Sequence, residues 1–276
     1  MAWVDMTDLT GLVAWYKPET LAATYANGDP ISTWADSSGN SRDLTGTTTT
    51  RPLAAASAIN GYMAADFDGT DDILSSASYT HSGNTVAVAV MNLDIVKNYS
   101  SAFCIDGVSP PSYINDFYLM QFDAIGRLRV MSSLPSNNHV ISNESYLFGA
   151  IAASTDYIFS GACSAVGGLC KANGQDALAV THTGSPSSAS GTAYIHMGDS
   201  GLASGFFDGK ICEVIIWSPT TNYAEVPWVE GYLADKYAIT LADGHLFKNE
   251  PPQSAPTTYN AAGGGSSKLI NGGLVD

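Results

Sequence analysis

The sequence from Phe206 to Trp217 reads Phe-Phe-Asp-Gly-Lys-Ile-Cys-Glu-Val-Ile-Ile-Trp, and it is almost wholly apolar after Lys210. Alternate side chains of an extended strand point to opposite faces. One face therefore carries Cys212, Val214 and Ile216, and the other carries Ile211, Glu213, Ile215 and Trp217. Only Glu213 interrupts the apolar character of these faces. A strand that is apolar on both faces is covered on both, so this stretch predicts a central strand of a layered β structure.

The period of the apolar residues changes after this strand. Val229, Leu233 and Tyr237 recur every four residues, which places them on one stripe of a helix. Proline is tolerated only in the first turn of a helix, so Pro227 marks the start. The pattern predicts one packed helix over Pro227–Tyr237.

Composition and charge limit the possible partners. The 276 residues suffice for one large β domain or two small ones. Only 13% of the residues are charged, and the net charge is −15 with 11 Lys and Arg residues. So few basic groups cannot neutralise a phosphate track, and the negative charge disfavours an anionic membrane surface. We therefore expect no nucleic acid and no membrane insertion. The N-terminus also lacks the basic and apolar regions of a secretion signal.

Short β-rich runs, separated by turn residues, occupy most of the chain. They are Gly11–Tyr16, Ile31–Trp34, Met63–Phe67, Thr85–Leu93, Ser101–Ile105, Phe117–Phe122, Leu128–Met131, Tyr146–Ala152, Tyr157–Ala162, Leu169–Ala172, Ala177–Val180 and Ala193–Met197. Many short strands with one late helix predict an antiparallel sandwich or barrel. We expect Ala193–Met197 to pair with the strand that ends at Trp217. The predicted buried residues are Trp15, Trp34, Phe67, Val88, Val214, Ile216 and Leu233.

The composition changes after Lys248. Residues 249–276 are rich in Pro, Gly and Ser, which predicts a flexible linker behind a domain that spans residues 1–248. The chain regains apolar character at its end. We expect this tail to dock on another chain through Leu269, Ile270, Leu274 and Val275. A disordered terminus is the alternative interpretation.

Four cysteines are present. Cys104 and Cys212 lie in apolar strand patterns, which predicts buried thiols. Cys163 and Cys170 are close enough in sequence to bridge a local hairpin, and the sequence does not decide whether they do. No pair has the C-x-x-C spacing of a structural zinc site.

Motifs at both ends of the chain resemble one known family. They are Gly11–Tyr16, Ile31–Asn40, Asn60–Leu74, Phe207–Trp217 and Glu230–Tyr237. Together they resemble a concanavalin A-like lectin/glucanase domain of the laminin-G-like, pentraxin-like type, which is found in bacterial surface proteins and phage virion proteins. The resemblance spans roughly Leu9 to Leu241, with generic strands in the middle. It implies an all-β, antiparallel jelly-roll sandwich of two sheets, with one short C-terminal helix and an extended C-terminal tail.

The sequence lacks the catalytic motif of the glucanases that share this fold. Those enzymes use paired carboxylates on a Glu-x-Asp-x-x-Glu strand. Asp94 and Glu213 each stand without a partner carboxylate on their runs. The segment Gly198–Gly201 imitates a protease nucleophile loop, but the matching histidine segment is missing, so a turn is favoured. We therefore predict no catalytic residue and no enzymatic activity.

Two turns are rich in oxygen ligands, the kind that Ca²⁺ needs. The first supplies Asp68, Asp71 and Asp72, and the second supplies Asp36. Asp-Gly and Ser-Gly-Asn sequences also form turns without any ion, and for each single residue this interpretation is favoured. The resemblance adds weight to calcium, because several relatives carry a calcium site on the rim of the sandwich.

The lack of a secretion signal, a domain that opens at Met1 and the apolar end of the tail favour a phage virion protein. It would be a capsid or tail decoration, spike or fibre protein that binds host-surface glycan. It would assemble in the host cytoplasm and contact other virion proteins or sister copies in a homo-oligomer. The alternative is an exported, extracellular bacterial carbohydrate-binding module or polysaccharide-degrading enzyme. A third interpretation is a decoration protein that binds only its own particle.

Overall fold

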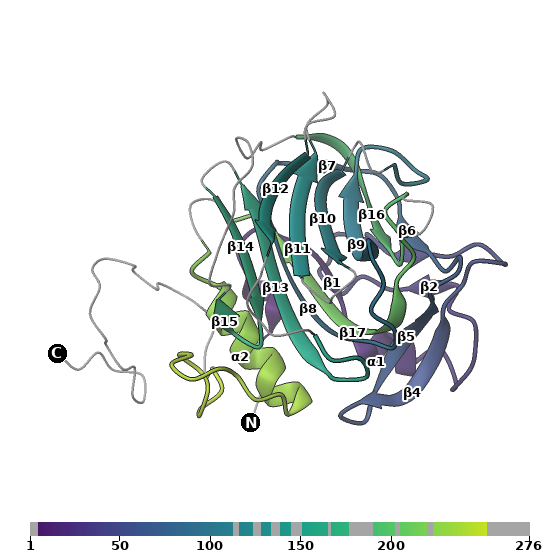
Figure 1. The fold of residues 1–276 in the computed structure, drawn as a ribbon. Helices are drawn as coiled ribbons and strands as arrows, with labels where there is room; N and C mark the ends of the chain where they lie inside the picture. Colours follow the sequence, from purple (N-terminus) through teal and green to yellow (C-terminus); the bar gives the residue numbers. More distant parts are fainter. Residues whose placement is uncertain are drawn as a thin grey trace.

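The computed structural model describes residues 5–112, 116–123, 128–133, 139–144, 151–164, 167–176, 190–201, 205–219 and 223–252. Within them, two antiparallel β-sheets pack face to face, and one helix covers the outer side of one sheet (Figure 1). The predicted all-β sandwich with a late helix is confirmed. Leu269, Ile270, Leu274 and Val275 lie outside the described residues, so their docking and the domain boundary at residue 248 stay predictions.

The first sheet, here called sheet A, contains the strand predicted to be central. Its strands are β1 (Leu12–Tyr16), β4 (Leu53–Ile59), β5 (Tyr62–Asp68), β8 (Thr85–Leu93), β13 (Tyr157–Ser164), β14 (Gly167–Ala172), β15 (Gln175–Asp176) and β17 (Asp208–Trp217). They lie in the order β15-β14-β13-β8-β17-β5-β4. Strand β1 pairs with the second half of β17, beyond the part of β17 that pairs with β5. Because β17 has β8 along its other edge, it lies in the middle of the sheet, as predicted.

The second sheet, sheet B, faces the first across the core. Its strands are β2 (Thr33–Trp34), β3 (Leu44–Thr45), β6 (Leu74–Ser76), β7 (Tyr79–His81), β9 (Ser100–Asp106), β10 (Asp116–Phe122), β11 (Leu128–Ser133), β12 (His139–Glu144) and β16 (Gly191–Met197). They lie in the order β12-β11-β10-β9-β16-β6-β3-β2, and β7 also pairs with β16. The expected pairing of Ala193–Met197 with β17 is wrong, because β16 belongs to the opposite sheet and pairs with β9.

A β-bulge changes the faces that the sequence predicts for β17. Ile211 pairs with Met91 and Glu213 with Val90, so Cys212 is an extra residue. Ile211 therefore joins the core between the sheets, and Cys212 lies on the helix side. Strict alternation predicts the reverse for both residues, and a sequence pattern of period two carries no sign of the extra residue.

Two apolar layers hold the fold together. The core between the sheets contains large aromatic side chains, among them Trp34, Phe67, Phe103, Phe122, Phe159 and Phe207. The second core lies between sheet A and the helix, and it contains Trp15, Val88, Trp217, Trp228 and Leu233. All seven side chains predicted to be buried are buried.

Helix α2 (Val226–Tyr237) confirms the predicted helix and begins one residue earlier. Pro227 lies in its first turn, and Ala238 ends it in the left-handed conformation with φ of 55°. The sequence did not predict the one-turn helix α1 (Pro18–Ala22), because five residues are too few to show a helical period. The 3₁₀ turn η1 (Met6–Asp8) precedes β1.

Some predicted strands differ from those observed. Strand β4 was missed because its alanine-rich sequence, Leu-Ala-Ala-Ala-Ser-Ala-Ile, favours a strand only weakly. Most of the strand predicted at Tyr146–Ala152 and all of Ala177–Val180 lie outside the described residues. Strand β12 ends at Glu144, just before the first of them.

Three cysteines, Cys104, Cys170 and Cys212, are buried. Cys104 and Cys212 are buried thiols, as predicted. Cys170 lies opposite Gly161 in the β13–β14 pair, whereas Cys163 lies opposite Gly168. The Cys170 thiol donates to the carbonyl oxygen of Leu128, 3.6 Å away, so it is not half of a disulfide.

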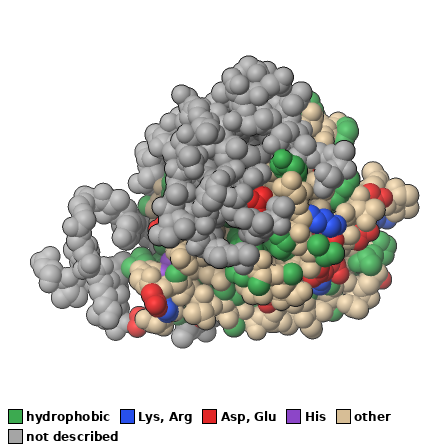
Figure 2. Space-filling view, viewed as in Figure 1, with side chains coloured by type: hydrophobic (Ala, Val, Ile, Leu, Met, Phe, Trp, Pro, Cys, Tyr) green, Lys and Arg blue, Asp and Glu red, His purple; other side chains and the backbone are tan. Residues whose placement is uncertain are grey.

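The surface carries few charges. Figure 2 shows one face whose described part is mostly polar-neutral and apolar, with scattered acidic and basic groups, in line with 13% of charged residues. Among the described residues, no helix combines the length and apolar character needed to span a membrane.

Replacing Ile216 with Ala tests the central position of β17. The side chain is fully buried between the sheets, so its truncation should lower the free energy of unfolding by about 2–5 kcal/mol through lost burial and a cavity. Urea denaturation measures the change. The control is Leu53→Ala on the neighbouring β4, where the side chain is 48% exposed. Equal losses in the two variants would contradict a central β17.

Candidate functional site

The first candidate site is the acidic turn between β5 and β6, which carries Asp68, Asp71 and Asp72. Gly69 follows the last residue of β5 with φ of +70°, a conformation that glycine adopts without strain. A Cβ atom at Gly69 would also overlap Lys97 and Asp208, so a larger residue would disturb the turn. Gly69 thus permits the sharp turn that carries Asp71 and Asp72 after β5.

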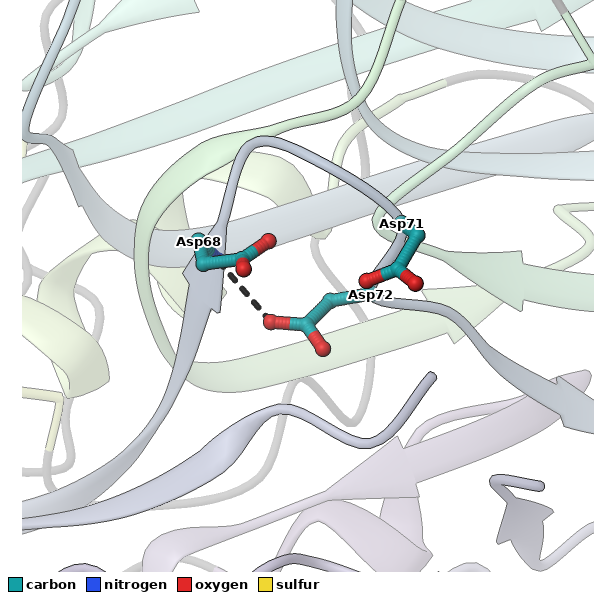
Figure 3. A group of neighbouring side chains, drawn as sticks. All are labelled: Asp68, Asp71 and Asp72. Carbon is teal, nitrogen blue, oxygen red and sulfur yellow. Dashed lines mark hydrogen bonds between the residues drawn. The ribbon is translucent and has the colours of Figure 1, made fainter. Parts of the chain in front are cut away.

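The three carboxylates are close enough to share one ion. One oxygen from each lies within 4.8 Å of the others. Two ligands of one Ca²⁺ ion, each about 2.4 Å from it, can lie up to about 4.8 Å apart. Figure 3 shows Asp68 and Asp71 turned toward each other, with Asp72 beside them. The backbone N–H of Asp68 donates to Asp72 Oδ2 at 2.9 Å, and that of Thr70 donates to Asp68 Oδ1 at 2.8 Å.

The acidic turn is electrostatically strained. Burial, together with the charges of Asp68 and Asp71, raises the pKa of Asp72 to about 6, although the N–H of Asp68 acts against the shift. The ammonium of Lys97, which donates to the carbonyl oxygen of Gly69 in this turn, is paired with another carboxylate: it lies 2.7 Å from Asp208 Oδ2. A cation between the carboxylates would relieve the repulsion.

Asp36 does not belong to this group. Its Oδ1 accepts from the N–H groups of Trp15 (3.0 Å) and Ser38 (2.9 Å), and its Oδ2 accepts from the Ser38 hydroxyl (2.7 Å) and the N–H of Arg42 (3.0 Å). Both oxygens therefore order the loop after β2. The side chain of Asp36 thus holds this turn together and ties it to Trp15 of β1.

The second candidate site is a cavity of about 300 Å³ beside helix α2, here called the Trp15 pocket. Its wall is formed by Asp5, Trp15, Lys17, Glu19, Tyr62, Tyr232 and Lys236. These residues come from η1's N-cap, β1, the β1–α1 junction, α1, the start of β5 and helix α2. The pocket thus forms where the helix meets one end of sheet A.

Glu213 holds the inner wall of the Trp15 pocket. It is fully buried on the helix side of β17. Its Oε1 accepts from Trp15 Nε1 at 2.7 Å and from the Tyr232 hydroxyl at 3.1 Å. Its Oε2 accepts from Lys236 Nζ at 2.7 Å and from the Tyr237 hydroxyl at 2.6 Å. Three of these four donors line the pocket, so one carboxylate fixes three parts of its wall.

The opposite charges of Glu213 and Lys236 stabilise each other. Burial lowers the pKa of Lys236, but the charge and hydrogen bond of Glu213, with those of Glu19, outweigh burial and raise it. Burial, and next the charge of Glu213, raise the pKa of Tyr232 and Tyr237. Lys236 is therefore an ammonium and both phenols are neutral donors at physiological pH.

One sign of this site is visible in the sequence. Glu213 is the single charge in the apolar run after Lys210, and a buried carboxylate needs hydrogen-bonding partners. The sequence could not show which partners, because Trp15 and Lys236 lie 198 positions before and 23 positions after it.

Sequence comparisons give no match: no known protein family and no curated protein matches this chain. Solved structures do match its fold. Domain 4 of an extracellular arabinanase from Geobacillus stearothermophilus, solved in complex with arabinotriose, is 15% identical with a TM-score of 0.53. The match covers 78% of this chain and 96% of that domain.

Two further matches differ in how much of the other protein they cover. The binding domain of Paraclostridial mosquitocidal protein 1 is 9% identical with a TM-score of 0.55, over 83% of this chain and 53% of that one. A Trypanosoma rangeli sialidase is 14% identical with a TM-score of 0.47, over 82% of this chain. This chain spans only 33% of the length of that sialidase. The arabinanase and mosquitocidal-protein domains, with TM-scores of 0.53 and 0.55, establish the fold alone.

The prediction that the chain is not an enzyme is contradicted. The arabinanase domain that shares the fold belongs to a glycoside hydrolase, so a missing Glu-x-Asp-x-x-Glu motif does not separate this chain from such enzymes. The motif belongs to one mechanism, whereas the sandwich is found in proteins with other chemistry.

We propose that Ca²⁺ binds Asp68, Asp71 and Asp72. Saturating Ca²⁺ should then raise the melting temperature and a chelator should lower it. Burial raises the pKa of Asp72 to about 6, so its contribution to stability falls as the pH rises through 6. At pH 7.5 Asp72 is ionised and can bind Ca²⁺, whereas at pH 5 it is mostly protonated. The calcium-dependent shift of the melting temperature should therefore be larger at pH 7.5. Asp72→Asn should abolish it, while Asp235→Asn on the exposed side of α2 should not. Equal shifts in wild type and Asp72→Asn would refute the site.

Replacing Glu213 with Gln tests the buried network. Lys236 would keep its buried charge without its nearest partner, so the free energy of unfolding should fall by about 3–5 kcal/mol. Chemical denaturation measures the loss, with Asp235→Asn on the same helix as the exposed control. An unchanged denaturation midpoint in Glu213→Gln would show that α2 does not depend on this carboxylate.

Proposed function

We propose that this chain is a carbohydrate-binding β-sandwich and that it holds sugar in the Trp15 pocket. The observation that carries the proposal is the composition of the wall, in which Trp15, Tyr62 and Tyr232 stand beside four charged side chains. Small-molecule sites are concave and rich in aromatic groups, with a few placed polar groups that orient the ligand. A sugar has both surfaces: C–H faces that pack on rings, and hydroxyls that need donors and acceptors.

The wall is pre-organised for binding. Glu213 orients Trp15, Tyr232 and Lys236 through hydrogen bonds of 2.7 to 3.1 Å. Side chains that are already fixed lose little conformational freedom when a ligand binds. Tyr62 is more exposed than the other two aromatic residues, and its ring packs edge-on against Tyr237 at 5.1 Å. Tyr62 is therefore the ring that a ligand can reach most directly.

The fold supports this proposal. The arabinanase domain that matches this chain over most of both lengths was solved with an oligosaccharide bound. The setting that we propose is accordingly the degradation of polysaccharide, in which a sandwich of this kind keeps an exported enzyme on its substrate. Release of reducing ends from the bound polysaccharide by the purified chain would extend the proposal from binding to catalysis.

A role in a phage particle is a more specific proposal than carbohydrate binding, and it rests on the sequence alone. It needs an adhesive tail at Leu269–Val275, which lies outside the described residues. Mass spectrometry of the native source tests it together with the predicted location: peptides of this chain in purified phage particles support it, and their absence from every particle fraction refutes it.

Binding to an array of plant and bacterial oligosaccharides, followed by titration calorimetry, tests the carbohydrate proposal. Tyr62→Ala should weaken binding about tenfold, because the most accessible aromatic ring of the wall is lost. Tyr99→Ala is the matched control, since Tyr99 is 40% exposed and is not part of the wall. Circular dichroism should show both variants folded. Equal affinities for the two variants would move the binding site away from the Trp15 pocket.

A further inference from the structure

The charges on the wall of the Trp15 pocket restrict the class of sugar that it can hold. Asp5, Lys17, Glu19 and Lys236 line the pocket. Lys236 is buried and already paired, whereas the side chains of Asp5, Lys17 and Glu19 can face a ligand. Lys236 and these three side chains therefore differ in how they affect the binding of a charged sugar.

Lys236 is not available to a ligand anion. Its side chain is 4% exposed, and its ammonium lies 2.7 Å from Glu213 Oε2 and 2.9 Å from Glu19 Oε1. It also donates to the Tyr232 hydroxyl. Two carboxylates thus surround one ammonium, so its positive charge is already compensated on the protein side.

Lys17 is the remaining cation of the wall. Its ammonium lies 4.4 Å above the Trp15 ring, where the π electrons stabilise it. Among the described residues, no carboxylate oxygen lies within 4.0 Å of this ammonium. Lys17 can therefore donate to a ligand oxygen.

The carboxylates on the rim outnumber this cation. Asp5 is exposed, and the side chain of Glu19 is 50% exposed. The pocket with Glu213 behind it holds three carboxylates and two ammonium groups, and the whole chain carries a net charge of −15. An acidic sugar would meet like charges at the rim and in the field of the protein.

We propose that the Trp15 pocket selects neutral, hydroxyl-rich sugars and excludes acidic ones such as uronates and sulfated sugars. The proposal rests on the carbohydrate-binding function proposed above. The carboxylates of Asp5 and Glu19 accept hydrogen bonds from sugar hydroxyls, and the ammonium of Lys17 donates to a sugar oxygen. Adjacent hydroxyls on one sugar ring need this combination of acceptors and a donor.

Competition between oligosaccharides of equal length tests the selection. The probes are neutral trisaccharides, including arabinotriose, and trigalacturonate, each titrated into the full chain at neutral pH and at low and high salt. A neutral trisaccharide should bind at least tenfold more tightly than trigalacturonate. The difference should shrink at high salt, because salt screens the rim carboxylates.

Two variants separate the proposal from its opposite. Glu19→Gln should strengthen trigalacturonate binding and narrow the gap. Lys17→Met should weaken binding of the neutral probe by about three- to tenfold, because one hydrogen bond of several is lost, and the neutral probe should stay the preferred ligand. Trigalacturonate that binds at least as tightly as the neutral probes, and loses its affinity in Lys17→Met, would overturn the selection but keep the carbohydrate-binding function. No binding of any oligosaccharide would overturn both.

Discussion

The arrangement of the helix layer depends on one buried carboxylate, Glu213. A charged group inside an apolar layer is costly unless every oxygen is hydrogen-bonded. Glu213 meets this condition with four donors, one from β1 and three from helix α2. These bonds are directional, so they fix the rotation and the axial position of α2 on sheet A. Apolar packing alone would tolerate small shifts of a helix along a flat sheet.

A second carboxylate, Glu230, fixes the other side of the helix. Its Oε1 accepts from the Ser160 hydroxyl of β13 at 2.6 Å, and its Oε2 accepts from His245 Nε2 at 3.0 Å. The N–H of Phe247 donates to His245 Nδ1, so the proton of the neutral imidazole lies on Nε2. Residues after the helix are thereby held over α2, where Phe247 packs on Gly231. This explains how α2 buries most of its residues although only one side faces the sheet.

The sequence predicted those features that depend on local patterns. Strand β8 has the predicted bounds, and α2 differs by one residue, because both have long apolar periods. The acidic turn was found because its three carboxylates lie within five residues of one another. The bulge at Cys212 was missed, because an extra residue leaves no mark in the pattern of apolar residues. The Trp15 pocket was missed because its wall is assembled from residues between Asp5 and Lys236, which only the fold brings together.

The same network links the stability of the fold to the shape of the pocket. Trp15, Tyr232 and Lys236 are nearly fully buried and bound to Glu213, so changing any of them disturbs both the helix layer and the wall. Asp5, Lys17, Glu19 and Tyr62 are more exposed. Substitutions at these four positions alter the charge and the aromatic surface offered to a ligand, and they leave the bonds of Glu213 in place. A sandwich built in this way can change its ligand preference at the rim while the inner wall stays constant, because structural and recognition roles are divided between different residues of one pocket.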